Sequence, residues 1–141
     1  MKKKLPYLIT IFSLICTYSF AQNTYYVKET LAGGSDSNDG LTIGNAFATI
    51  QYANDTAADG DTIEISDGVY TETVVLSKSL TINGASANGT IIQATASQPD
   101  GAGTGASAST RVFDIGSSKD VVLKNLTIQY GNTTQLGGGV F

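Results

Sequence analysis

The sequence predicts an all-β protein, built as a parallel β-helix (a solenoid of stacked coils) with a short capping helix near the N-terminus. Three observations support this fold class: short apolar runs separated by turn residues, one near-repeat within the chain, and a single segment with helical periodicity. A β-sandwich would also give short strands, so the near-repeat is what favours the solenoid.

Residues 1–21 are predicted to be a secretory signal peptide rather than part of the fold. Three lysines precede a mostly apolar segment, and Ser19–Ala21 places small residues at the two positions that a signal peptidase recognises. The apolar segment of about 16 residues is short for a transmembrane anchor, which needs roughly 20. A lipoprotein is the weaker alternative, because Ile15 is too large for the residue expected before a lipid-modified Cys16.

The composition of residues 22–141 excludes several classes of function. They carry 5 basic and 12 acidic side chains, a net charge of −7, so no basic footprint exists for a nucleic-acid backbone. The chain has no His, and its one Cys lies in the signal peptide. Catalysis by a His side chain is therefore excluded, and so are disulfides and zinc sites built from Cys and His. No transmembrane segment is expected once the signal peptide is removed.

Residues 22–60 are predicted to form an opening strand, a loop and the capping helix. Thr24–Val27 consists of β-formers, and Gly33–Gly40 of residues that favour turns. Asn45 is the expected N-cap of the helix and Gly60 its stop. Between them, four apolar residues recur at spacings of three to four: Phe47, Ile50, Ala53 and Ala57. We expect Phe47 and Ile50 to face the first coil and close the open end of the solenoid.

Residues 61–141 are predicted to form the first coils. The expected strands are Thr62–Ile65, Val74–Leu76, Leu80–Ile82, Thr90–Ile92, Val112–Ile115, Val121–Leu123 and Leu126–Ile128. The Leu-Thr-Ile triplets that begin at Leu80 and Leu126 are 46 residues apart. This spacing equals two coils of about 23 residues. The Leu and Ile side chains of both triplets are therefore expected to point inward at equivalent positions, with the Thr side chains outward.

Two further segments complete the prediction for the coils. Ala94–Thr110 is rich in Ala, Gly, Ser and Thr, and is expected to be a protruding loop. Asn83 and Asn125 flank the two Leu-Thr-Ile triplets. Stacked strands would bring such amides together in a hydrogen-bonded ladder with a structural role.

Five motifs follow one another in the first half of the chain: Tyr25–Val27, Gly34–Gly40, Ala46–Gln51, Gly60–Ile63 and Gly68–Glu72. In this order they resemble the N-terminal cap and first coils of secreted right-handed parallel β-helix proteins of the pectate-lyase-like superfamily. Gly137–Phe141 is similar to the Gly-Gly-aliphatic-aromatic repeat of polymorphic outer-membrane proteins. The resemblance implies a right-handed solenoid, and a bacterial protein that is secreted or held on the outer-membrane surface. Because the chain stops within this pattern, we expect it to be the N-terminal part of a longer protein.

Asp36, Asn38 and Asp39 are weak candidates for a calcium site, because hard cations prefer clustered oxygen ligands. Their spacing is too compact for an EF-hand, and Phe47 stands where the bidentate Glu should be. We favour the simpler interpretation, a turn whose Asp and Asn side chains cap their own backbone. No other metal or cofactor is expected.

The resemblance also implies an alternative function, lyase chemistry on uronic-acid polymers. Enzymes of that kind place several Asp around calcium, with a Lys or Arg to take the sugar proton. The candidates are Arg111, Asp114, Lys119, Asp120 and Lys124. Nothing in the sequence groups them into such a constellation, so no catalytic residue is assigned.

The sequence therefore favours a secreted or cell-surface protein that offers an adhesive or structural surface. The expected partners are extracellular polysaccharides or surface proteins. A polysaccharide lyase, or another carbohydrate-active enzyme on the same fold, is the alternative.

Overall fold

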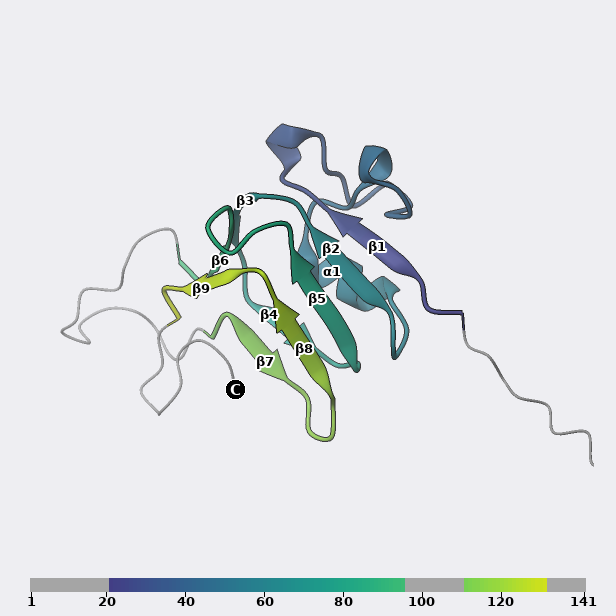
Figure 1. Cartoon of the computed structure of the whole chain (residues 1–141), viewed down its shortest axis with the longest axis vertical. Helices are drawn as coiled ribbons and strands as arrows, with labels where there is room; N and C mark the ends of the chain where they lie inside the picture. Colours follow the sequence, from purple (N-terminus) through teal and green to yellow (C-terminus); the bar gives the residue numbers. More distant parts are fainter. Residues whose placement is uncertain (1–20, 96–110, 132–141) are drawn as a thin grey trace, which may run out of the picture.

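The computed structural model describes residues 21–95 and 111–131, which form short parallel strands and one α-helix (Figure 1). Three predicted features lie outside these residues: the signal peptide up to residue 20, the loop from residue 96 onward, and the repeat at Gly137–Phe141.

The strands form three sheets, in which every described strand pair is parallel. The first sheet has the order β1 (Thr24–Val27), β2 (Thr62–Ile65), β5 (Leu80–Gly84) and β8 (Val121–Lys124). The second has the order β3 (Gly68–Thr71), β6 (Thr90–Gln93) and β9 (Thr127–Gln129). The third pairs β4 (Val74–Leu76) with β7 (Phe113–Ile115). The helices are η1 (Thr30–Ala32), η2 (Ile43–Asn45) and α1 (Ile50–Thr56).

The predicted right-handed parallel β-helix with a capping helix is corrected by this arrangement. The strands are three to five residues long and are distributed over three small sheets of four, three and two strands, not a clear solenoid. The expected dominance of β structure remains.

The 46-residue repeat explains the error. The first Leu-Thr-Ile triplet lies in β5, where Leu80 has Val121 as its partner across the sheet. The second triplet contributes to β9 in another sheet, where Ile128 lies opposite Ile92. Similar residue strings therefore do not occupy equivalent positions.

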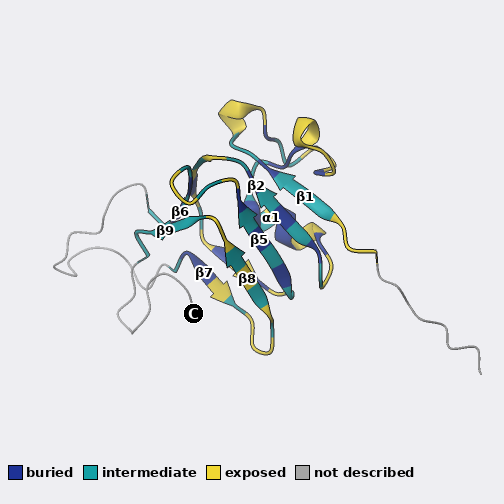
Figure 2. Cartoon of the chain, viewed as in Figure 1, coloured by how far each residue is buried: buried dark blue, intermediate teal, exposed yellow. Residues whose placement is uncertain are grey.

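The core follows from strict alternation along the strands. β2 reads Thr-Ile-Glu-Ile and β5 reads Leu-Thr-Ile-Asn-Gly, with the aliphatic side chains buried and the polar ones partly exposed. In parallel register these apolar positions line up, so Ile63 and Ile82 are both fully buried. Figure 2 shows the resulting dark bands of buried residues on β2 and β5, the two inner strands of the four-stranded sheet. Complete burial of one such side chain contributes roughly 2 kcal/mol.

Helix α1 begins later than the sequence predicted, because Thr49 and not Asn45 is its N-cap. The Thr49 side-chain oxygen accepts a hydrogen bond from the Tyr52 backbone N–H. Ile50 and Ala53 are buried, and the helix packs against β1, β2 and β4. None of the helices in residues 21–95 and 111–131 has the length and apolar character required to cross a bilayer.

Phe47 lies before α1 rather than within it. Its backbone N–H donates to Tyr26 O at 2.8 Å, and its carbonyl accepts from Lys28 N at 3.0 Å, which places it beside β1. The ring is 1% exposed, stacks on Tyr25 and meets Tyr52 edge-on. Gly40 has φ +68°, and a Cβ there would lie 2.2 Å from the Phe47 ring, so only glycine fits beneath this aromatic group.

Candidate functional site

The outward side of the four-stranded sheet carries two rows of side chains that cross the strands. Because the strands are parallel and in register, each row has a spacing of about 4.8 Å. The threonine row consists of Thr24, Thr62 and Thr81 and ends at Val122. The mixed row consists of Tyr26, Glu64, Asn83 and Lys124. All eight side chains are partly or fully exposed, and we call them the outer polar face.

The middle of the mixed row continues into an amide ladder, which confirms the predicted pairing of Asn83 with Asn125. Asn83 Nδ2 donates to both carboxylate oxygens of Glu64, at 3.1 and 2.9 Å. Asn125 Nδ2 donates to Asn83 Oδ1 at 2.9 Å. These bonds fix the plane of the Asn83 amide and the orientation of the Glu64 carboxylate.

A second ladder runs along the three-stranded sheet. Gln93 Nε2 donates to Thr71 Oγ1, and Gln129 Nε2 donates to Gln93 Oε1, each at 2.9 Å. This ladder was not predicted, although Gln93 and Gln129 each directly follow a predicted apolar strand. Both ladders join side chains of adjacent strands, so they reinforce the parallel register.

The calcium candidates are engaged with the backbone. Asp36 Oδ1 accepts from the N–H groups of Ala48 and Thr49. Asn38 Nδ2 donates to Ala46 O at 2.9 Å, and Asp39 Oδ1 accepts from Leu41 N at 3.0 Å. The Asp39 bond, to the N–H group two residues further on, caps its own turn as predicted, whereas Asp36 and Asn38 bond to the backbone of residues 46–49. In the part of the chain that the structure describes, no group of three or more Asp, Glu, His or Cys side chains could hold a metal ion.

Two carboxylates from distant segments take up four consecutive backbone N–H groups at the start of α1. Asp36 binds residues 48 and 49, and Glu72 accepts from Ile50 N and Gln51 N at 3.0 Å each. Burial raises the pKa of Glu72 above its ordinary value of 4.5, although the two N–H groups oppose this shift; the nearby Asp36 raises the pKa further. The folded protein therefore disfavours the charged form of Glu72 relative to the unfolded chain.

The raised pKa of Glu72 predicts a pH effect on stability. A carboxyl group whose pKa is higher in the folded state than in the unfolded state stabilises the fold at low pH. That contribution is lost as the pH rises from about 4.5 through the folded-state pKa. Glu72→Gln stays neutral, so its unfolding free energy, relative to wild type, should increase between pH 4 and pH 7 as measured by urea titration. Asp39→Asn, at an exposed carboxylate, is the control, and a relative stability of Glu72→Gln that falls with pH would contradict the prediction.

The predicted lyase candidates do not converge. Arg111 lies 3.8 Å from Asp114 in an ion pair three residues apart, while Lys124 belongs to the mixed row. Lys119 is 3.5 Å from Asp59, at the turn that precedes β8. The structure thus divides these side chains between separate elements and separate contacts.

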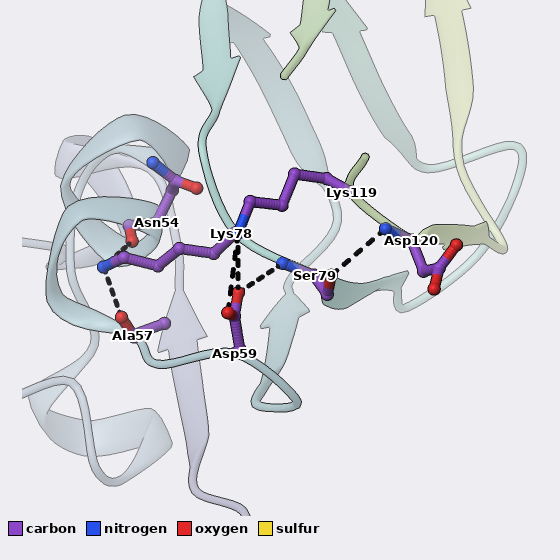
Figure 3. Close-up of polar contacts among 7 residues, drawn as sticks. All are labelled: Asn54, Ala57, Asp59, Lys78, Ser79, Lys119 and Asp120. Carbon is purple, nitrogen blue, oxygen red and sulfur yellow. Dashed lines mark hydrogen bonds and ion pairs between the residues drawn. The ribbon is translucent and has the colours of Figure 1, made fainter. Parts of the chain in front are cut away.

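Figure 3 shows the polar contacts that connect the turns around Asp59, Ser79 and Asp120. Asp59 accepts from Ser79 N at 2.7 Å, and the Ser79 hydroxyl accepts from Asp120 N at 3.1 Å. The backbone N–H of Ser79 and, to a lesser extent, Lys119 lower the pKa of Asp59. Lys78 donates to the carbonyl oxygens of Asn54, Asp55 and Ala57 at the end of α1. A cation at this end of a helix satisfies unpaired carbonyls and complements the helix dipole. These contacts join turns to one another and to α1.

A groove of about 260 Å³ lies beside β3. Three of its polar side chains make internal contacts: Glu29 accepts from Val69 N, Glu72 caps α1, and the Tyr70 hydroxyl donates to Ser66 O. Burial, with a contribution from Glu29, raises the pKa of Tyr70 and keeps its hydroxyl protonated. The groove is therefore built of structural contacts.

The outer polar face was not predicted as a site, although Thr81 was expected to point outward, as it does. Alternation already places Thr62, Glu64, Thr81 and Asn83 on one side. What the alternation does not provide is the register that places these residues in two continuous rows.

Comparisons of the chain with protein-family models, curated proteins and solved structures give no match. The resemblance to the pectate-lyase-like superfamily rests on the motifs of the sequence alone.

Proposed function

We propose that this chain is an exported protein whose outer polar face binds extracellular glycans or surface proteins without transforming them. The observation that carries the proposal is the pair of rows of partly or fully exposed, mostly hydrogen-bonding side chains. These rows lie on a sheet whose register is fixed by parallel pairing and by the Glu64–Asn83–Asn125 ladder. A rigid surface of this kind binds with little loss of side-chain freedom.

The chemistry of the face supports binding rather than catalysis. Acid–base catalysis needs a donor and an acceptor that converge on one substrate atom. Glu64 is the one carboxylate of the outer polar face, and it is engaged with Asn83. The cation of the face, Lys124, lies two strands away from Glu64.

The proposal is tested by passing the chain from Gln22 onward over immobilised neutral and anionic polysaccharides. Retention on at least one polymer, without release of unsaturated or newly reducing sugar ends, is the expected result. Thr81→Gln, which adds bulk at the centre of the face, should reduce retention. The matched Val75→Gln, at a 55% exposed position on β4, should not. Release of products would show instead that the protein is an enzyme, and a chain retained on no polymer would refute glycan binding.

The predicted export has a separate test. If residues 1–21 are a cleaved signal peptide, material from outside the cell should begin at Gln22. Intact mass or N-terminal sequencing measures this directly. An external chain that still begins at Met1 would refute cleavage, and one that begins at Cys16 would indicate the lipoprotein.

A further inference from the structure

We propose that the ligand of the outer polar face is a neutral polysaccharide laid across the strands, and not an anionic one. This inference rests on the proposed function and adds the chemical class of the ligand. It concerns the mixed row in particular, where a ring, a carboxylate, an amide and an ammonium group follow one another on adjacent strands.

The hydrogen-bonding character of the rows matches sugar hydroxyl groups. A hydroxyl group both donates and accepts, as do the threonines of the first row. Glu64 is fixed by the Asn83 amide at 3.1 and 2.9 Å, but carboxylate oxygens have further lone pairs that accept hydroxyl protons. Hydroxyl groups that donate to a carboxylate form charge-assisted hydrogen bonds, which are stronger than neutral ones.

Tyr26 supplies the apolar contact at one end of the mixed row. It lies in β1, directly beside Glu64 in the register, and the residue is partly exposed. Aromatic rings offer a flat apolar surface with a polar edge. A sugar ring can stack on such a surface while its hydroxyl groups reach the neighbouring Glu64 carboxylate.

The charge distribution disfavours a polymer with carboxylate groups. A negative group of the ligand that lies over Tyr26 or Asn83, the neighbours of Glu64 in the row, would be about 5 Å from the Glu64 position and would be repelled by its carboxylate. Lys124 is two strands from Glu64, about 10 Å, which is roughly one Debye length at moderate salt. Residues 22–141 also carry a net charge of −7, which repels polyanions over the whole molecule.

Affinity electrophoresis of the chain from Gln22 onward tests the inference, with β-glucan and galactomannan as neutral polymers and polygalacturonate and alginate as anionic ones. The wild type should be slowed by a neutral polymer and not by the anionic ones. Tyr26→Ala should bind about tenfold more weakly. Tyr26→Phe, which keeps the ring, and Val75→Ala, outside the face, should bind as wild type does. Glu64→Gln keeps an acceptor for Asn83 and should be slowed by polygalacturonate more than the wild type is.

The outcomes separate the inference from the function on which it rests. Retardation by the anionic polymers in preference to the neutral ones would overturn the inference and leave glycan binding intact. Retardation by none of the four would overturn the inference and glycan binding together, and would leave surface proteins as the partner. Neutral-polymer binding that is equal in wild type and in a folded Tyr26→Ala, with an unchanged urea midpoint, would show that the ligand does not lie on this row.

Discussion

Replacing Phe47 by alanine is expected to lower the free energy of unfolding by about 4 kcal/mol. The ring is 1% exposed and stacks with Tyr25 at a centroid distance of 5.9 Å. It also contacts Tyr52 edge-on at 5.0 Å. Removing it leaves a cavity that the neighbouring backbone cannot fill, because the backbone of residue 47 is held to β1 by two hydrogen bonds. Urea denaturation of the chain from Gln22 onward measures the loss.

Phe47→Leu is the matched control, since it keeps most of the buried apolar volume and should cost about 1.5 kcal/mol. If Phe47→Ala has the urea midpoint of the wild type, the segment before α1 does not cover the core between β1 and the helix.

Replacing Ile82 by asparagine should also cost about 4 kcal/mol. Ile82 is fully buried in β5, which has strands on both sides, so the introduced amide would lose its hydration and leave unpaired groups. Thr81→Ser, one residue away on the outer polar face, should change stability by less than about 0.5 kcal/mol. A small effect of Ile82→Asn together with a large effect of Thr81→Ser would mean that the strand presents the opposite face to the core.

Ile128 distinguishes the observed register from the predicted one. The 46-residue repeat predicts equivalent positions for Ile82 and Ile128, but Ile128 lies in β9 and is only partly buried. Ile128→Asn should therefore destabilise the protein less than Ile82→Asn does. Equal losses would favour the predicted 46-residue stacking over the observed pairing.

Alternation was sufficient to predict most strands but not their neighbours. Thr62–Ile65 and Val74–Leu76 form strands with the predicted bounds. Aliphatic side chains at every second residue lie on one side of the backbone when the segment is a strand, so this pattern indicates a strand directly. The prediction that the two Leu-Thr-Ile triplets stack was wrong, because this pattern indicates only which side chains face inward. It does not indicate which sheet the strand joins. The strand Gly68–Thr71 was not predicted from its residues, since glycine and a single valine give no clear period.

The same distinction applies to the candidate site. Asn83 and Asn125 were predicted to pair, because both flank strand ends and both side chains can donate and accept. The alignment of Tyr26 with Glu64 depends on a pairing across 38 residues of chain, which no local pattern encodes. The loop acids were weak candidates for metal ligands, but the structure pairs them with backbone N–H groups: Asp39 caps its own turn, whereas Asp36 bonds to Ala48 and Thr49.

The capping of α1 by Asp36 and Glu72 has a consequence for the order of folding. A helix of seven residues is too short to persist in water by itself. Its first two N–H groups, those of Ile50 and Gln51, bond to Glu72, which lies more than twenty residues downstream. The N–H groups of Ala48 and Thr49, just before the helix, bond to Asp36, which lies twelve or more residues upstream. The helix therefore cannot act as a local nucleus, and it should form late, together with the strands that bring those two carboxylates into place. In hydrogen exchange, its amides should open with the surrounding sheets as one cooperative unit and not by fraying of the helix alone.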